Sequence, residues 1–155
     1  NPMKKHKKYG GKIYNKCLPL CVLSPSSIII HKEIFDDVGL FDEKLPVCED
    51  YDMWLRICYK YEVLFLNQKL IYKYGGHDDQ LSKKYWGMDR YRVIALEKMI
   101  HNKSLSNIEK IATINMGIEK IKILYKGYIK HGHKKEAQEM SEKLIKFTSL
   151  NELYI

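Results

Sequence analysis

Hydrophobic side chains in the second half of the chain recur every three to four residues, which is the spacing of one face of an α-helix. From Tyr85 onward, one such stripe consists of Met88, Tyr91, Ala95 and Met99. Ser106, followed three residues later by Glu109, matches a capping box and predicts the start of a long helix. The apolar positions of that helix are Ile111, Ile114, Ile118, Ile121, Tyr125 and Tyr128. Gly132 predicts its end, and a further helix is predicted by Ala137, Met140, Leu144 and Phe147.

The first half has shorter apolar runs that favour strands. Ile28, Ile29 and Ile30 predict a short buried strand, and two more strands are predicted at 63–66 and 70–74. A short helix is expected from Lys32 to Val38, ending at Gly39. Together these elements predict an α/β fold followed by a C-terminal helical hairpin at residues 101–155.

The segment 47–56 places three carboxylates, Glu49, Asp50 and Asp52, in the first turn of a second predicted helix. The buried face of this helix is expected to include Trp54, Leu55, Ile57, Cys58 and Tyr61. A carboxylate mounted rigidly in this way suits a general base. The alternative also stands, because peptide dipoles favour acidic side chains at any helix start.

Composition describes a globular chain with one strongly basic end. The 155 residues are 45% hydrophobic and 30% charged, and the formal net charge is +8. Residues 1–16 hold six Lys and no acid, which leaves 21 basic and 19 acidic side chains in the rest. We therefore assign the basicity to a solvated leader segment and expect no nucleic-acid partner; attraction of that segment to anionic lipid stays open.

Four cysteines, Cys17, Cys21, Cys48 and Cys58, match neither a zinc-site spacing nor a disulfide framework. We expect free thiols and a cytoplasmic setting, in which a peripheral location at the inner face of the membrane stays open. No apolar run is long enough for a membrane span. The chain starts at Asn1-Pro2 without an initiator Met, and we expect that its natural N-terminus lies upstream.

Three stretches resemble family 2 glycosyltransferases of the GT-A type. Residues 48–56, CEDYDMWLR, are similar to the acidic "ED…D-hydrophobic-W-hydrophobic-R" segment of that family. Residues 24–43 resemble the strand and "F-x-x-V-G-x-F-D-E" run that precede it, and residues 77–82 resemble an "H-x-x-Q-x-S" segment. The resemblance covers roughly residues 17–100 and implies a partial GT-A-like mixed sheet with flanking helices.

The resemblance implies an inverting sugar transfer from a nucleotide-sugar donor to the hydroxyl of a carbohydrate or lipid-linked acceptor, in cell-surface polysaccharide biosynthesis. Asp50 would be the general base, and Glu49 beside it would orient the acceptor hydroxyl or raise the proton affinity of Asp50 through its like charge. Substrate-binding positions would be Asp52, Trp54, Arg56, Gln80 and Ser82, and His77 would contact a divalent metal (Mg or Mn) in the complete enzyme.

The family's nucleotide-binding half, with its D-x-D metal motif, has no counterpart in this sequence. Asp50-Tyr51-Asp52 has the D-x-D letters but stands in a helical context. We therefore expect residues 17–100 to be the acceptor-side half of such an enzyme, inactive alone. Oligomerisation through the C-terminal helices stays open, and the alternative function is a non-catalytic protein-interaction module.

Overall fold

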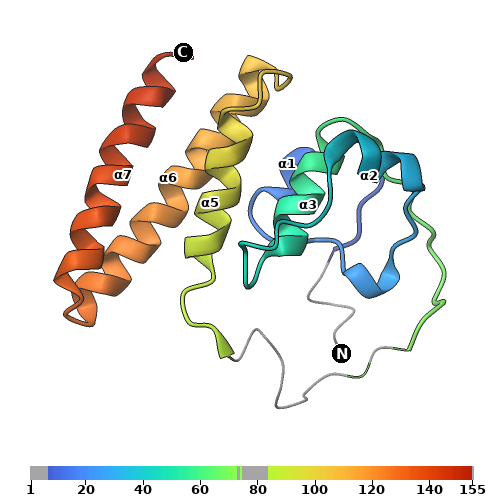
Figure 1. Cartoon of the computed structure of the whole chain (residues 1–155), viewed down its shortest axis with the longest axis horizontal. Coiled ribbons are helices and arrows are strands. Elements are labelled where there is room, and N and C mark those ends of the chain that lie inside the picture. The colour runs from blue at the N-terminus through green and yellow to red at the C-terminus, as the bar shows by residue number, and fades with distance from the viewer. Residues whose placement is uncertain (1–6, 73, 75–83, 155) are drawn as a thin grey trace. The chain divides into compact units, whose positions relative to one another are not determined.

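The computed structural model describes residues 7–72, 74 and 84–154. Its contacts divide the chain into two compact units, Asn1–Trp86 and Gly87–Ile155. The first contains α1 (Tyr14–Cys17), the 3-10 helix η2 (Pro25–Ser27), α2 (Lys32–Val38) and α3 (Glu49–Cys58). The second contains α5 (Asp89–Ile100), α6 (Asn107–Lys130) and α7 (Lys134–Glu152) (Figure 1). All the secondary-structure elements of the described residues are thus helices.

Helix α3 is the centre of the first unit. Seven of its ten residues are buried, and α1 and α2 pack against it. The predicted start at Glu49 and the burial of Trp54, Leu55, Ile57 and Cys58 are confirmed. Tyr61, predicted on the same buried face, lies beyond the end of the helix and is partly exposed. Helix α2 has the predicted bounds and ends at Gly39, whose φ of 81° suits glycine because no Cβ is present to clash.

The predicted mixed sheet is wrong. Across residues 7–72, 74 and 84–154 no strand forms, and the one isolated bridge joins Gly11 to Val63. Ile28 is extended (φ −123°, ψ 141°), but its neighbour Ile29 is fully exposed, not buried, and so is most of Leu64. High β-propensity makes a segment extended only locally. A strand also needs a neighbour that pairs its N–H and C=O groups, and the predicted segments provide none for one another.

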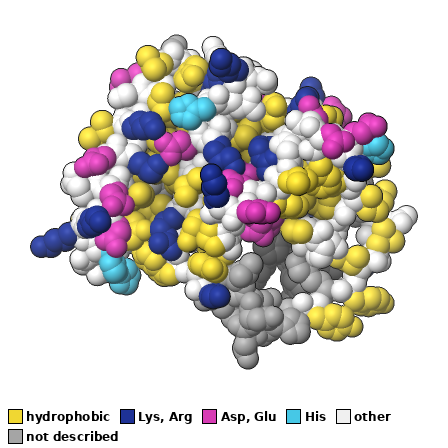
Figure 2. All heavy atoms as spheres, viewed as in Figure 1, with side chains coloured by type: hydrophobic (Ala, Val, Ile, Leu, Met, Phe, Trp, Pro, Cys, Tyr) yellow, Lys and Arg dark blue, Asp and Glu magenta, His cyan; other side chains and the backbone are white. Residues whose placement is uncertain are grey.

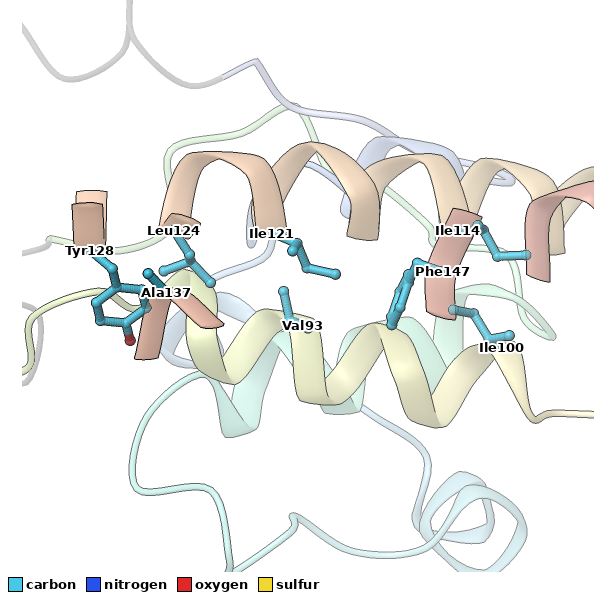
Figure 3. Close-up of a cluster of buried hydrophobic side chains, with 8 residues drawn as sticks. All are labelled: Val93, Ile100, Ile114, Ile121, Leu124, Tyr128, Ala137 and Phe147. Atoms are coloured by element: carbon cyan, nitrogen blue, oxygen red, sulfur yellow. The ribbon is translucent and has the colours of Figure 1, made fainter. Parts of the chain in front are cut away.

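The second unit is a packed set of three helices. Figure 3 shows side chains from α5, α6 and α7 filling the space between these helices. The Ser106–Glu109 capping box is present in full, and Gly132 (φ 75°) follows α6 as predicted. Of the predicted apolar stripe on α6, Ile114, Ile121 and Tyr128 are buried, whereas Tyr125 lies 38% exposed. The contacts group α5 with α6 and α7. No helix among the described residues is both long and apolar enough to cross a bilayer.

Candidate functional site

The acidic turn of α3 begins at a residue with an unusual backbone. Cys48, which precedes the helix, has φ 63° and ψ 19°, and it is the sole non-glycine residue of the described chain with a positive φ. A left-handed conformation costs an ordinary residue roughly 1–2 kcal/mol. Such strain often occurs at functional sites, where the surrounding structure enforces it. Here it precedes the helix that carries Glu49, Asp50 and Asp52.

Asp50 is half-buried and is held by two donors. The backbone N–H of Tyr51 donates to its Oδ1 at 2.7 Å, and the thiol of Cys21 lies 3.2 Å from its Oδ2. The same thiol is 3.1 Å from the carbonyl oxygen of Leu23, so its single proton is shared between two acceptors. Glu49, next to Asp50, is also half-buried and forms no ion pair with the described residues. Both residues are thus partly exposed to solvent.

The Cys21 thiol is kept in its neutral, donating form. Burial raises its pKa, and the negative charge of Asp50 and the hydrogen bond to that carboxylate raise it further. The thiol is therefore protonated at neutral pH and can donate to an ionised Asp50.

Asp52, the third carboxylate, serves a different purpose. Its side chain is 1% exposed, and Arg56 Nε donates to its Oδ2 at 3.0 Å. The guanidinium group of Arg56 also donates to the backbone carbonyls of Val38, Gly39 (3.3 Å) and Leu40 (2.8 Å). Arg56, fixed by its ion pair with Asp52, thus holds residues 38–40 at the end of α2 against α3.

Two aromatic side chains of α3 hold the segment 18–23 by hydrogen bonds to its backbone. Trp54 is 3% exposed, and its Nε1–H donates to the carbonyl of Leu23 at 3.0 Å. Its ring meets Phe41 edge-on, with centroids 6.3 Å apart. The Tyr51 hydroxyl donates to the carbonyl of Leu18 at 2.6 Å. These contacts place Cys21 beside Asp50.

The structure thus places five of the eight predicted site residues on α3. Glu49 and Asp50 lie partly exposed at its N-terminal end, Asp52 and Trp54 are buried further along it, and Arg56 in its last turn is partly exposed. His77, Gln80 and Ser82 fall outside the described residues, and their predicted roles stay predictions. Within the described ranges, no three His, Cys, Asp or Glu side chains gather as a metal site requires. Cys21 was not predicted as a site residue, because nothing in the local sequence links it to a carboxylate 29 positions later.

Comparison with known proteins identifies three relatives over about half of the chain. Proteins named uncharacterized glycosyltransferase from Rickettsia conorii and Rickettsia felis are 31% and 32% identical to it over 76 residues, 48% of this chain. A protein of the same name from Rickettsia bellii is 32% identical over 75 residues, 47% of this chain. The matched stretch spans only 11–12% of the length of these relatives. Neither a protein-family model nor a solved structure matches the chain.

Proposed function

We propose that this chain is part of a glycosyltransferase in which Asp50 is the general base. The observation that carries the proposal is the contrast within one helical turn. Asp52 is buried in an ion pair, whereas Asp50 and Glu49 stay accessible at the end of a helix held by Arg56, Trp54 and Tyr51. The rickettsial relatives supply the reaction class, and the resemblance of residues 48–56 to family 2 enzymes supplies the role of Asp50.

The proposed reaction is a single displacement. An acceptor hydroxyl attacks the anomeric carbon of a nucleotide-sugar, and the proton of that hydroxyl passes to the Asp50 carboxylate. The bond between the anomeric carbon and the phosphate oxygen breaks, and a nucleoside diphosphate leaves. Attack on the face opposite the leaving group inverts the anomeric configuration. The α3 N-terminus suits this step, because its dipoles favour the negative charge that a base needs before it accepts a proton.

The surrounding residues have supporting roles in this proposal. Glu49 orients the acceptor hydroxyl, and the Cys21 thiol holds one oxygen of Asp50 at 3.2 Å. Asp52, Arg56 and Trp54 act on the substrate indirectly. Trp54 holds the segment that ends at Leu23, and Arg56, paired with Asp52, holds residues 38–40. A divalent metal on His77 belongs to the proposal for the complete enzyme. In this proposal the Asp50 carboxylate takes the proton.

The test uses the full-length protein that contains this chain. Release of the nucleoside diphosphate is measured over a panel of nucleotide-sugars and acceptors, for the wild type and for Asp50→Asn. The amide cannot accept the proton, so we expect kcat to fall by about 10²–10⁴-fold, with an unchanged urea midpoint. Asp50→Glu should retain part of the activity.

Asp36→Asn is the matched control, since it removes the same charge from an exposed position on α2. It should turn over as the wild type does. Equal turnover by Asp50→Asn and Asp36→Asn would contradict the base assignment and favour a non-catalytic interaction module.

A further inference from the structure

Positive charge in the second unit gathers where α6 ends. Residues 120–135 contain six Lys, two His and no Asp or Glu. Lys120 is buried and donates to Asp89 at 3.0 Å. The other five are exposed, and none forms an ion pair with a described residue: Lys122, Lys126, Lys130, Lys134 and Lys135.

Two other lysines of the same unit are paired with one acid. Lys143 and Lys146 each lie 2.6 Å from a carboxylate oxygen of Glu97. Glu97 therefore neutralises part of their positive charge within the fold. The five exposed lysines at the end of α6 have no such acidic partner among the described residues, and their charge can attract an anionic ligand.

Apolar side chains lie among the unpaired lysines. Ile123 is 61% exposed, Ile129 55% and Tyr125 38%. At about 100° per residue, these three share an arc of roughly 160° with Lys122, Lys126 and Lys130, opposite the buried positions of the helix. We call this set of six residues the α6 basic face. Glu119, exposed one turn before Lys122, marks its N-terminal limit. Figure 2 shows hydrophobic side chains at the surface among charged ones on one face of the chain.

We propose that the α6 basic face docks on an anionic lipid bilayer. The lysines complement the negative lipid headgroups, and Lys134 and Lys135 at the start of α7 add to the same field. Ile123 and Ile129 favour a bilayer over a nucleic acid, because the boundary between headgroups and acyl chains accepts aliphatic side chains and a phosphate backbone does not. This inference goes beyond the proposed function, since no step of it involves Asp50.

Flotation with lipid vesicles tests the proposal on the full chain. The protein should float with vesicles of phosphatidylcholine mixed with phosphatidylglycerol and should stay behind with phosphatidylcholine alone. The variant Lys122→Gln/Lys126→Gln/Lys130→Gln should bind about a hundredfold more weakly, since each lysine near an anionic surface contributes roughly fivefold. Ile123→Ser/Ile129→Ser should also bind more weakly, and its deficit should persist at high salt, where charge attraction is screened.

The matched control, Lys32→Gln/Lys44→Gln/Lys69→Gln, removes three exposed charges from the first unit. It should bind nearly as the wild type does, and circular dichroism should show the same helix content in every variant. Equal losses in the two lysine variants would reduce the effect to net charge and overturn the proposal. Unchanged vesicle binding by Ile123→Ser/Ile129→Ser would also overturn the proposal. The same holds if an oligonucleotide binds the wild type more tightly than the anionic vesicles do and requires the same lysines.

Discussion

Glu49, Asp50 and Asp52 stand within four residues, and their surroundings separate their roles. A helix turns each side chain about 100° from the one before it, so adjacent acids face different neighbours. Asp52 is buried and accepts a hydrogen bond from Arg56 one turn later, whose side chain is 17% exposed. Asp50 faces residue 21 of the preceding chain and keeps contact with solvent. The difference in exposure separates Glu49 and Asp50 from Asp52. The resemblance of residues 48–56 to family 2 enzymes is what makes Asp50, of these two, the proposed base.

The contact between Asp50 and Cys21 predicts a change in thiol reactivity. Alkylation requires the thiolate, and burial together with the Asp50 charge raises the pKa of Cys21. Asp50→Asn removes the charge, lowers the pKa of that thiol and should therefore speed its alkylation at alkaline pH. The rate is measured with iodoacetamide by mass spectrometry of the Cys21 peptide. Asp36→Asn should leave the rate unchanged, and a slower reaction in Asp50→Asn would contradict the geometry.

Gly117 on α6 is required by close packing. A Cβ built there would lie 2.3 Å from Cε1 of Phe147, whose ring is fully buried. We expect Gly117→Ala to lower the free energy of unfolding by about 1–3 kcal/mol, because the ring cannot move without disturbing the core. Urea denaturation followed by circular dichroism measures the effect.

Gly127, ten residues later on the same helix, is a matched control. Nothing lies within 4 Å of the Cβ position there. Gly127→Ala should stabilise the protein by about 0.5–1 kcal/mol, since alanine has the higher helix propensity. Two substitutions of the same kind in one helix should thus have opposite signs, and equal effects would show that packing at Phe147 does not decide them.

At the scale of elements, buried charge links the helices of the second unit. Asp89 on α5 accepts from Lys120 of α6 at 3.0 Å and from Arg92 at 2.8 Å. Burial raises the pKa of Asp89, but the hydrogen bonds and charges of Arg92 and Lys120 outweigh it and hold that pKa below its usual value. Lys120 is itself buried. The pair therefore ties the packing of α5 and α6 to the ionisation of one carboxyl group.

This pair predicts a pH-dependent stability. An acid with a lowered folded-state pKa stabilises the fold above its unfolded pKa, and the stabilisation is lost as pH falls through the folded value. Asp89→Asn should cost about 1–3 kcal/mol at neutral pH, since it leaves Lys120 without that charge. The gap from the wild type should begin to shrink as pH falls below about 4, where the unfolded chain takes up the proton, and should close once pH is below the lowered folded-state pKa of Asp89. Urea titrations at several pH values measure it. With Glu119→Gln, which alters an exposed acid, the gap should be near zero at every pH.

At the scale of the whole molecule, the candidate base lies in one contact unit and the proposed lipid-binding face in the other. The two functions should therefore be separable. Asp50→Asn should lower the kcat of sugar transfer by about 10²–10⁴-fold and leave vesicle flotation unchanged. The α6 lysine variant should instead weaken flotation and retain transfer to a soluble acceptor. A loss of both properties in either variant would point to a folding defect, which the urea midpoint would reveal.

The sequence by itself was sufficient for the features that arise from local interactions. The capping box at Ser106, the helix ends at Gly39 and Gly132, and the start of α3 at Glu49 each depend on a few neighbouring residues and were predicted correctly. The position of Asp50 at a helix N-terminus is a feature of the same kind, because the residues next to it in the sequence predict where the helix begins.

Only the tertiary structure decided the features that depend on distant partners. The runs at 28–30, 63–66 and 70–74 favour extended backbone, but a strand forms only when another segment completes its hydrogen bonds, and no local pattern reports that. The Cys21–Asp50 contact, the Arg56 hydrogen bonds to residues 38–40 and the Lys120–Asp89 pair likewise join residues 16 to 31 positions apart. Periodicity identifies the face that a helix buries, but the fold determines which groups meet across it.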